Sequence, residues 1–242
     1  MRVTRIVVGG MLWLAVAAWA QTAEELVAKN LQARGGVDKI KAVNTVKMAG
    51  TAYVMGINAG FSQENKRPNM IRQEFTIQGM TQIQAYDGSV GWQISPFQGR
   101  KTAELMGEDD TRDLIDNSDI DGPLVDYQTK GNQVEYLGHD MVDGDDAYKL
   151  KVTLKNGDVI YYYLDPDTYL EIKTEKQEYI RGSIRYVEEL LGSYKQVAGV
   201  YYPYSIEMTM KGGSGPDHAR ITFDTIEANV PIEDSYFKMP SK

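Results

Sequence analysis

The sequence predicts a mainly β protein, of the α+β kind, in which a curved antiparallel sheet forms an unclosed β-barrel. From Asn44 onwards, apolar and polar residues alternate with a period of two in roughly ten segments. Turn signals such as Asp87-Gly88 and Asn156-Gly157 separate neighbouring segments. Strands do not alternate with long helical segments, which excludes a doubly wound parallel sheet.

A sheet of this size must curl, because its twist accumulates and its edge strands need protection from other chains. Its apolar face also needs a cover. The chain offers an N-terminal helix and one short helical insert for this purpose. Two short pieces are a thin cover, so we expect a partly filled hollow on the concave face. Side chains that fill the barrel completely are the alternative.

The N-terminal residues 1–20 have the pattern of a secretory signal peptide. Arg2 and Arg5 form a basic start, Ile6 to Ala20 is an uncharged apolar run, and Ala18-Trp19-Ala20 is a small-x-small ending. The run is shorter than the ~20 apolar residues that span a bilayer. We therefore expect cleavage after Ala20, with a retained anchor as the alternative, and a single domain over residues 21–242.

Composition and charge narrow the classes of partner and of chemistry. The chain has 242 residues, a formal net charge of −8 and no cysteine. Phosphate backbones repel an acidic chain, so nucleic acid is not expected as a partner. Without cysteine there are no disulfides, thiolate metal sites or lipid-modified N-terminal cysteines. These properties fit a bacterial envelope, and the predicted location is the periplasm.

A helix opens the mature chain. Thr22 can cap it, and Glu25 stands three residues later as the capping-box partner. Gly35-Gly36 ends the helix, and residues 37–43 add one short helical turn. The inward positions follow helical spacing: Leu26, Val27, Asn30 and Leu31.

The first half of the sheet is a meander of strands joined by short hairpins. Alternation is seen in four runs: Val46 to Val54, Ile71 to Ile77, Thr81 to Ala85 and Val90 to Ile94. We expect apolar side chains from these runs to wall the hollow and to contact an acyl chain. The predicted ligand-binding residues are Ile71, Phe75, Ile77, Ile83, Val90, Trp92 and Ile94. The alternative is that they form an ordinary core.

The alternation stops between Thr102 and Asp126, where acidic residues gather from Glu104 to Asp121. We expect one or two short helices there, packed on the sheet by Leu105, Met106, Leu114, Ile115 and Ile120. Two interpretations of the acidic insert 104–121 stay open, a mobile lid and a calcium-binding loop. The second arises because residues 117–122 match the first half of an EF-hand loop, but Gln128 stands where that loop needs a bidentate glutamate.

Strands resume after the insert and continue to the end of the chain. A strong hairpin signal, Asn156-Gly157, and the turn Asp165-Pro166-Asp167 separate some of them. The predicted strands are Gln133–Leu137, Ala147–Leu154, Val159–Leu164, Leu170–Gln177, Ser183–Leu190, Tyr201–Met210 and Arg220–Glu227.

The sequence contains no motif that is typical of a catalytic site. There is no Gly-x-Ser-x-Gly elbow, and neither His139 nor His218 lies in an HExxH frame. Gly213-Ser214-Gly215 is interpreted as a hairpin loop, and the aspartates around Gly144 as a solvated turn. We expect no enzyme, no cofactor and no bound metal. The alternative is a carboxylate-based hydrolase that would use Asp109, Asp110, Asp113 or Asp116.

The segment Tyr86-Asp87-Gly88-Ser89-Val90-Gly91-Trp92-Gln93-Ile94-Ser95-Pro96-Phe97 resembles the Asp-Gly-x-x-x-Trp-x-x-x-Pro-Phe segment of LolA-like periplasmic lipoprotein carriers. The order of elements is similar as well: signal, helix, strand, meander, helical insert and further strands. Further segments resemble bacterial proteins described as outer-membrane lipoprotein-sorting-like: the opening helix with Gly35-Gly36, Tyr163-Leu164-Asp165-Pro166, Val200-Tyr201-Tyr202-Pro203-Tyr204 and Phe237-Lys238-Met239-Pro240.

The resemblance implies an unclosed barrel, lidded by helices, that holds the acyl chains of a lipoprotein or of another lipid without catalytic residues or a metal. It also implies an arginine that pins the lid, for which Arg67 and Arg72 are the nearest candidates by position. The predicted function is an exported soluble carrier in envelope lipoprotein sorting. The expected partners are a lipid or an acylated lipoprotein and, in addition, envelope membrane proteins. A non-catalytic envelope assembly or interaction module with a filled barrel is the second hypothesis.

Overall fold

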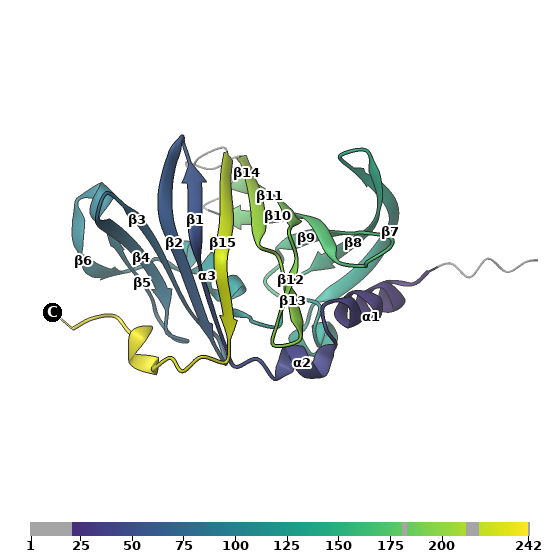
Figure 1. Cartoon of the computed structure of the whole chain (residues 1–242), viewed down its shortest axis with the longest axis horizontal. Helices are drawn as coiled ribbons and strands as arrows, with labels where there is room; N and C mark the ends of the chain where they lie inside the picture. Colours follow the sequence, from purple (N-terminus) through teal and green to yellow (C-terminus); the bar gives the residue numbers. More distant parts are fainter. Residues whose placement is uncertain (1–20, 181–182, 212–217, 242) are drawn as a thin grey trace, which may run out of the picture.

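The computed structural model describes residues 21–180, 183–211 and 218–241. The predicted signal peptide and the Gly213-Ser214-Gly215 loop lie outside these ranges. Within them, thirteen strands form one antiparallel sheet in the order β6-β5-β4-β3-β2-β1-β15-β14-β11-β10-β9-β8-β7, and β12 and β13 form a separate hairpin (Figure 1). In the described part of the chain β6 and β7 are edge strands, so the sheet curves without closing. This confirms the predicted fold class.

The strands follow one another along the chain mostly as hairpins. They are β1 (Thr45–Val54), β2 (Ile57–Lys66), β3 (Met70–Ile77), β4 (Met80–Tyr86), β5 (Gly91–Ser95), β6 (Arg100–Leu105), β7 (Gln133–Val142), β8 (Asp145–Thr153), β9 (Val159–Leu164), β10 (Glu171–Ile180), β11 (Ser183–Gly192), β12 (Lys195–Val197), β13 (Val200–Tyr202), β14 (Ser205–Lys211) and β15 (His218–Ala228). The helices are α1 (Ala23–Ala33), α2 (Val37–Lys41), α3 (Glu108–Ser118) and α4 (Tyr127–Lys130), with 3-10 turns η1 (Pro96–Gln98) and η2 (Asp234–Tyr236).

One strand lies where the helical insert was expected to begin. Residues 100–105 form β6, which pairs with β5, and the side chain of Leu105 is 65% exposed instead of packing on the sheet. Ile115 is exposed as well, whereas Leu114 is buried as expected. An edge strand that carries charges and has a solvent-facing side need not alternate apolar and polar residues, so the sequence pattern did not reveal β6.

Helix α1 begins and ends as the sequence predicts. The Thr22 side chain accepts a hydrogen bond from the Glu25 backbone, and the Glu25 carboxylate accepts one from the Thr22 backbone, which completes the capping box. At the other end, Gly35 has a φ of 129°, and a Cβ there would lie 2.1 Å from the Gly199 carbonyl oxygen. Only glycine permits this close approach of α1 to the β12–β13 hairpin.

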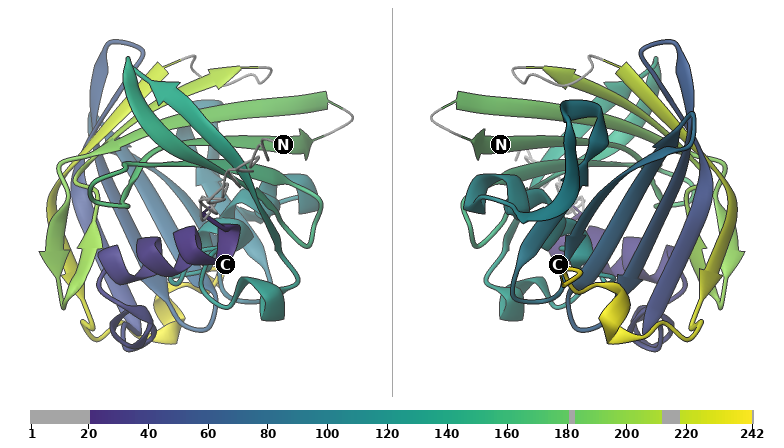
Figure 2. Two further views of the ribbon diagram at one scale, coloured as in Figure 1. Left: turned by 90° about the vertical axis from the view of Figure 1, so that its right-hand side faces the viewer. Right: turned by 90° about the vertical axis from the view of Figure 1, so that its left-hand side faces the viewer.

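The main core lies between α1, α2 and the inner face of the sheet, which is the face that these helices cover (Figure 2). Leu26 and Ile40 from the helices are fully or almost fully buried there. The sheet contributes rows of inward residues from strands far apart in the sequence: Val46, Ala52, Phe61, Leu150, Val152, Leu164, Ile221 and Phe223. Burial of each large aliphatic side chain contributes about 1.5–3 kcal/mol, so this core holds the central strands and the β8–β9 region of the sheet to one pair of helices.

Helix α3 lies against the inner side of β3, β4 and β5. Leu114 is 3% exposed and packs on Ile71 and Tyr86. A Cβ on Gly91 would lie 2.4 Å from the Thr111 hydroxyl oxygen, so the helix approaches β5 closely. The short apolar side of α3 therefore fixes it on one half of the barrel.

The C-terminal segment covers the outer face of the same three strands (Figure 2). The Trp92 indole nitrogen donates to the Phe237 carbonyl oxygen at 2.7 Å. Arg72 Nη1 donates to the Tyr236 carbonyl oxygen at 2.9 Å, and its guanidinium lies 4.4 Å from the centre of the Tyr236 ring. Covering segments therefore contact both faces of β3–β5: α3 on the inner face, and the chain end at Arg72 and Trp92 on the outer face.

Candidate functional site

A cavity of about 840 Å³ lies between α3, the loop that follows it, and the inner face of β9, β10, β11 and β14. We call α3 and this loop, residues 108–123, the cover. The volume falls within the roughly 300–1,000 Å³ of typical ligand pockets. Its apolar lining consists of Ile115, Leu154, Ile160, Tyr162, Val187, Met208 and Met210.

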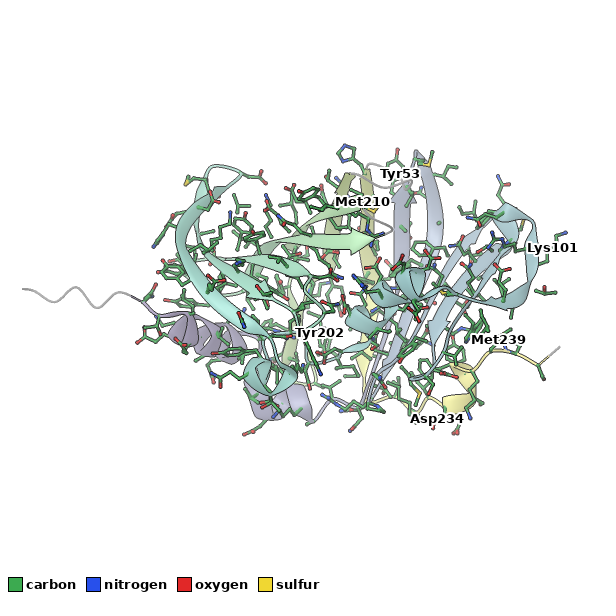
Figure 3. All side chains as sticks on the ribbon, turned by 180° about the vertical axis from the view of Figure 1, so that it is seen from behind. Tyr53, Lys101, Tyr202, Met210, Asp234 and Met239 are labelled. Atoms are coloured by element: carbon green, nitrogen blue, oxygen red, sulfur yellow. The ribbon has the colours of Figure 1, made fainter. Side chains whose placement is uncertain are left out.

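Strand alternation and register build the apolar wall of this cavity. Val187 on β11 lies opposite Met210 on β14, and two residues further along Glu189 lies opposite Met208. Because directly paired residues of an antiparallel sheet project to the same face, all four side chains point inward. Figure 3 labels Met210 towards the upper end of the barrel and Tyr202, a core residue, towards the lower end. The cavity adjoins the main core, with which it shares Ile160 and Tyr162.

The cover carries carboxylates and the wall carries cations where the two meet. Lys176 Nζ lies 2.9 Å from Asp116 Oδ2 and 3.4 Å from Asp113 Oδ1. Arg185 forms a second ion pair with Asp113. The Lys176 and Asp116 side chains are only 16% and 19% exposed, so water screens this pair less than a surface pair. These ion pairs join α3 to the wall on the side away from Leu114.

Two polar groups lie deeper in the wall. Thr174 Oγ1 donates to Glu189 Oε2 at 3.1 Å. Burial raises the pKa of the Glu189 carboxyl, although the Thr174 hydrogen bond and the Lys176 charge oppose this shift. Burial also raises the pKa of the Tyr162 phenol, so its hydroxyl keeps its proton. The wall is therefore apolar with a few polar groups, as in many ligand sites.

Arg67 holds the end of the cover against the N-terminal helices. Its Nε donates to the Val43 carbonyl oxygen at 2.6 Å and its Nη2 to the Ile40 carbonyl oxygen at 3.1 Å. Its Nη1 donates to Asp121 Oδ2 at 2.9 Å, and Nη2 reaches Oδ1 at 2.5 Å. Burial acts to raise the pKa of Asp121, but the hydrogen bonds and charge of Arg67 outweigh it and lower that pKa. Of the two candidate pinning arginines, Arg67 contacts the cover and Arg72 lies on the outer face.

Six of the seven predicted ligand-binding residues are divided between two faces of the sheet, and the seventh, Val90, lies outside the strands. Ile71 pairs with Tyr86 and faces α3, and Phe75 and Ile77 follow on the same inner face. Ile83 pairs with Ile94 on the outer face, as Ala85 does with Trp92. Val90 precedes β5 and is 40% exposed. The seven side chains therefore do not form one surface, and the 840 Å³ cavity has other walls.

Three of the predicted residues have structural contacts on their own faces of the sheet. Ile71 is fully buried under Leu114, and the Phe75 ring lies 4.8 Å from the Phe61 ring. Trp92 is fully buried beneath the C-terminal segment, with the Arg72 guanidinium 5.6 Å from its ring. Ile77, Ile83 and Ile94 are half-buried. Contact of any of these residues with a ligand stays a prediction.

The sequence analysis did not identify the residues that line the cavity. The alternating residues of β11 and β14 were visible as strands, but their pairing joins segments more than twenty residues apart and brings Val187 beside Met210. In β10, Lys176 occupies an inward position in register with Ile160 and Val187. Its inward neighbour Thr174 is also polar, so the alternation in β10 did not distinguish this face from the outer one.

The acidic motifs have partners within the protein. Asp119 lies 2.5 Å from Lys130 Nζ, and Asp121 binds Arg67, so both central carboxylates of the EF-hand-like segment are ion-paired. His139 Nδ1 lies 2.7 Å from Asp146 Oδ2 at an exposed end of the β7–β8 hairpin. Across residues 21–180, 183–211 and 218–241, no group of three or more His, Asp or Glu side chains could hold a metal ion. No helix in these ranges has the length and apolar character needed to cross a membrane.

No family model matches this sequence, and no curated protein does either. Solved structures do share its fold. A LolA superfamily protein from Nitrosomonas europaea is similar with a TM-score of 0.59 and 14% identity, over 90% of this chain and 98% of that one. A putative outer membrane lipoprotein-sorting protein domain from Vibrio parahaemolyticus has a TM-score of 0.55 and 13% identity, over 87% and 97%. A DUF1329 family protein from Desulfovibrio piger has a TM-score of 0.53 and 12% identity, over 89% and 97%. The chain therefore has a LolA-like fold.

Proposed function

We propose that the protein is an exported carrier that binds the acyl chain of a lipid or an acylated lipoprotein in the cavity beneath the cover. The observation that carries this proposal is the apolar wall of Ile160, Val187, Met208 and Met210 around about 840 Å³ of open space. The shared fold supports it, because two of the similar structures are described as a LolA superfamily protein and a lipoprotein-sorting domain. The periplasm as location and delivery to envelope membrane proteins are parts of the same proposal.

Binding would be driven by burial of apolar surface. Each Å² of acyl chain removed from water contributes about 25 cal/mol, which favours long chains over short ones. We propose that the cover moves during entry and release, because α3 forms one side of the cavity. The attachments that would have to open are the ion pairs of Asp113 and Asp116 and the Arg67–Asp121 contact.

Native mass spectrometry of the protein purified from its host tests the proposal. We expect a species that carries one additional lipid mass, which organic extraction removes. Met208→Glu should abolish this species, because it places a charge among the apolar side chains of the wall. Thr209→Glu is the matched control, since it adds the same charge at the next position of β14, beside His218 at the exposed end of the strand.

Two outcomes would contradict the carrier. A bare protein mass under all gentle conditions would favour the envelope interaction module with a filled barrel. Equal lipid occupancy in folded Met208→Glu protein would show that the lipid lies elsewhere. Sequencing of the mature N-terminus tests export separately, and we expect it to begin at Gln21.

A further inference from the structure

We infer that the cavity selects acyl amphiphiles with an anionic head group, a carboxylate or a phosphate, and that Lys176 and Arg185 bind this group. The inference rests on the proposed carrier function and names the class of its cargo. It is drawn from the cations of the wall and the position of their counter-ions.

Lys176 and Arg185 lie on neighbouring strands and face the same space. Lys176 on β10 pairs with Val187 on β11, and Arg185 lies two residues before Val187 on the same face. Both side chains line the cavity beside Met210. Their exposed fractions are 16% and 26%, so each cation lies largely within the wall, next to apolar side chains.

Carboxylates of the cover form ion pairs with both cations. Asp113 and Asp116 belong to α3, whereas Lys176 and Arg185 belong to the sheet. Asn156 in the β8–β9 turn adds a hydrogen bond from Nδ2 to Asp116 Oδ1 at 3.4 Å. The carboxylates of α3 thus occupy the position that an acidic head group would take at the end of an acyl chain in the cavity.

In this arrangement, binding of a ligand depends on the charge of its head group. When α3 moves aside to admit a chain, Asp113 and Asp116 move away from the wall with it. Moving these carboxylates away weakens the compensation of two largely buried cations, and a ligand anion restores it. The planar guanidinium of Arg185 suits carboxylate and phosphate oxygens, because its donors match their spacing. A neutral or cationic head group supplies no such compensation.

Glu189, an acidic residue of the wall itself, does not cancel this preference. It lines the cavity on β11 and accepts a hydrogen bond from Thr174 at 3.1 Å. Burial raises the pKa of its carboxyl, which favours the neutral form relative to an exposed glutamate. Glu189 therefore opposes an anionic head group less than an exposed glutamate would.

Titration calorimetry on the delipidated full chain tests the inference with four ligands that share one alkyl length. The ligands are dodecanoate, dodecyl phosphate, dodecan-1-ol and dodecyltrimethylammonium. We expect the two anions to bind at least about tenfold more tightly than the alcohol, as charge-assisted hydrogen bonds would give. The cation should bind most weakly. Inorganic phosphate at the same concentration should not displace dodecyl phosphate.

Two variants of β10 test whether Lys176 causes the preference for anionic amphiphiles. Lys176→Met should lower the affinity for both anions about tenfold relative to the affinity for the alcohol. Lys173→Met is the matched control, because Lys173 lies on the outer face of the same strand and pairs with Glu175 and Glu188. It removes the same net charge and should change neither affinity. Asp116→Asn should strengthen anion binding, since it removes a competing carboxylate.

The outcomes separate the inference from the proposed function. Equal affinity of wild-type protein for the anions and the alcohol would overturn the inference and leave the carrier intact. Loss of anion preference in Lys173→Met to the same extent as in Lys176→Met would also overturn it, since net charge alone would then explain the preference. Absence of binding by all four amphiphiles, or displacement by inorganic phosphate, would overturn both. If Lys176→Met does not fold, the wild-type series still decides.

Discussion

Single side chains connect parts of this molecule that are distant in the sequence. Arg67 joins the cover to the backbone carbonyls of Ile40 and Val43, and Trp92 binds the carbonyl of Phe237. In each case a side-chain donor satisfies a carbonyl at the end of a helix or a loop, where no strand partner is available. These residues therefore determine how the helices and the chain end are placed on the sheet.

Asp121→Asn tests the attachment of the cover. The substitution keeps the shape but removes the charge that Arg67 binds, so we expect a loss of about 2 kcal/mol in the free energy of unfolding at pH 7. Because the pKa of Asp121 is lowered in the folded protein, this contribution is present above the unfolded pKa of 3.8 and is lost as pH falls through the folded value. Urea unfolding of both proteins at several pH values measures the difference. A difference that stays constant down to pH 2 would contradict the assignment.

Glu64→Gln should change the free energy of unfolding in the opposite direction, by making the protein more stable at pH 7. Glu64 is 4% exposed, and burial raises its pKa, with Lys47 opposing and Glu74 reinforcing the shift. Folding then favours the protonated form, so stability is greatest below the unfolded pKa of 4.5 and declines as pH rises through the folded value. We expect the glutamine variant to be more stable at pH 7 by on the order of 1 kcal/mol. The gain should vanish near pH 4 in thermal unfolding, and a gain independent of pH would contradict this account.

For Trp92, the sequence predicted burial but not the face of the sheet on which the side chain lies. Period-two alternation correctly indicated a buried tryptophan, because burial of an aromatic residue on a strand follows from local pattern. The face it occupies depends on η2 and Phe237, more than 140 residues later in the chain. No local pattern states which face such a segment covers, so the seven predicted site residues were placed on one surface when they lie on two.

At the scale of elements, α3 connects two halves of the barrel by two kinds of contact. Its apolar residue Leu114 packs on β3 and β4, while Asp113 and Asp116 bind cations of β10 and β11. The sequence predicted a helical insert and its burial through Leu114. It did not predict that the opposite side of the helix forms ion pairs, because an exposed aspartate and an ion-paired aspartate have the same sequence pattern. Edge strand β6 was missed for a related reason, since strong alternation requires one buried face.

Gly91→Ala tests the close approach of α3 to β5. The new Cβ would lie 2.4 Å from the Thr111 hydroxyl oxygen, so the helix must shift. We expect a loss of about 1–3 kcal/mol in the free energy of unfolding, as overpacking usually gives. Hydrogen exchange should increase in α3 and remain unchanged in β15.

A second substitution supplies the control for this prediction. Thr111→Ala removes the hydroxyl and methyl groups that the new Cβ would meet, so the double variant should recover part of the lost stability. Gly79→Ala provides a comparison without such a neighbour, since no atom lies within 4 Å of a Cβ there. Its positive φ of 79° gives a backbone cost instead, without the change in α3 exchange.

At the scale of the whole molecule, the interior has a filled part and a hollow part. Helices α1 and α2 fill the end of the barrel around Leu150 and Leu164, both fully buried. The thinner cover leaves the space beside β9, β10, β11 and β14 open. The sequence predicted that the helices would cover the sheet only in part. The hollow lies in the half of the barrel where charged side chains of the cover bind the sheet. The antiparallel order of strands, which decides this half, follows from long-range pairing that local patterns do not contain.

Two substitutions to tryptophan distinguish the hollow part from the filled part. Val187→Trp places a large ring in the cavity, where space is available, so we expect a change of less than about 1.5 kcal/mol in the free energy of unfolding and a strong loss of dodecan-1-ol binding. Leu150→Trp introduces the same ring where the leucine is fully buried, and overpacking should cost at least about 1–3 kcal/mol. Urea unfolding and calorimetry measure both effects. If Val187→Trp destabilises the fold as much as Leu150→Trp does, the space beneath the cover is closed in solution, and the barrel interior has no room for a ligand.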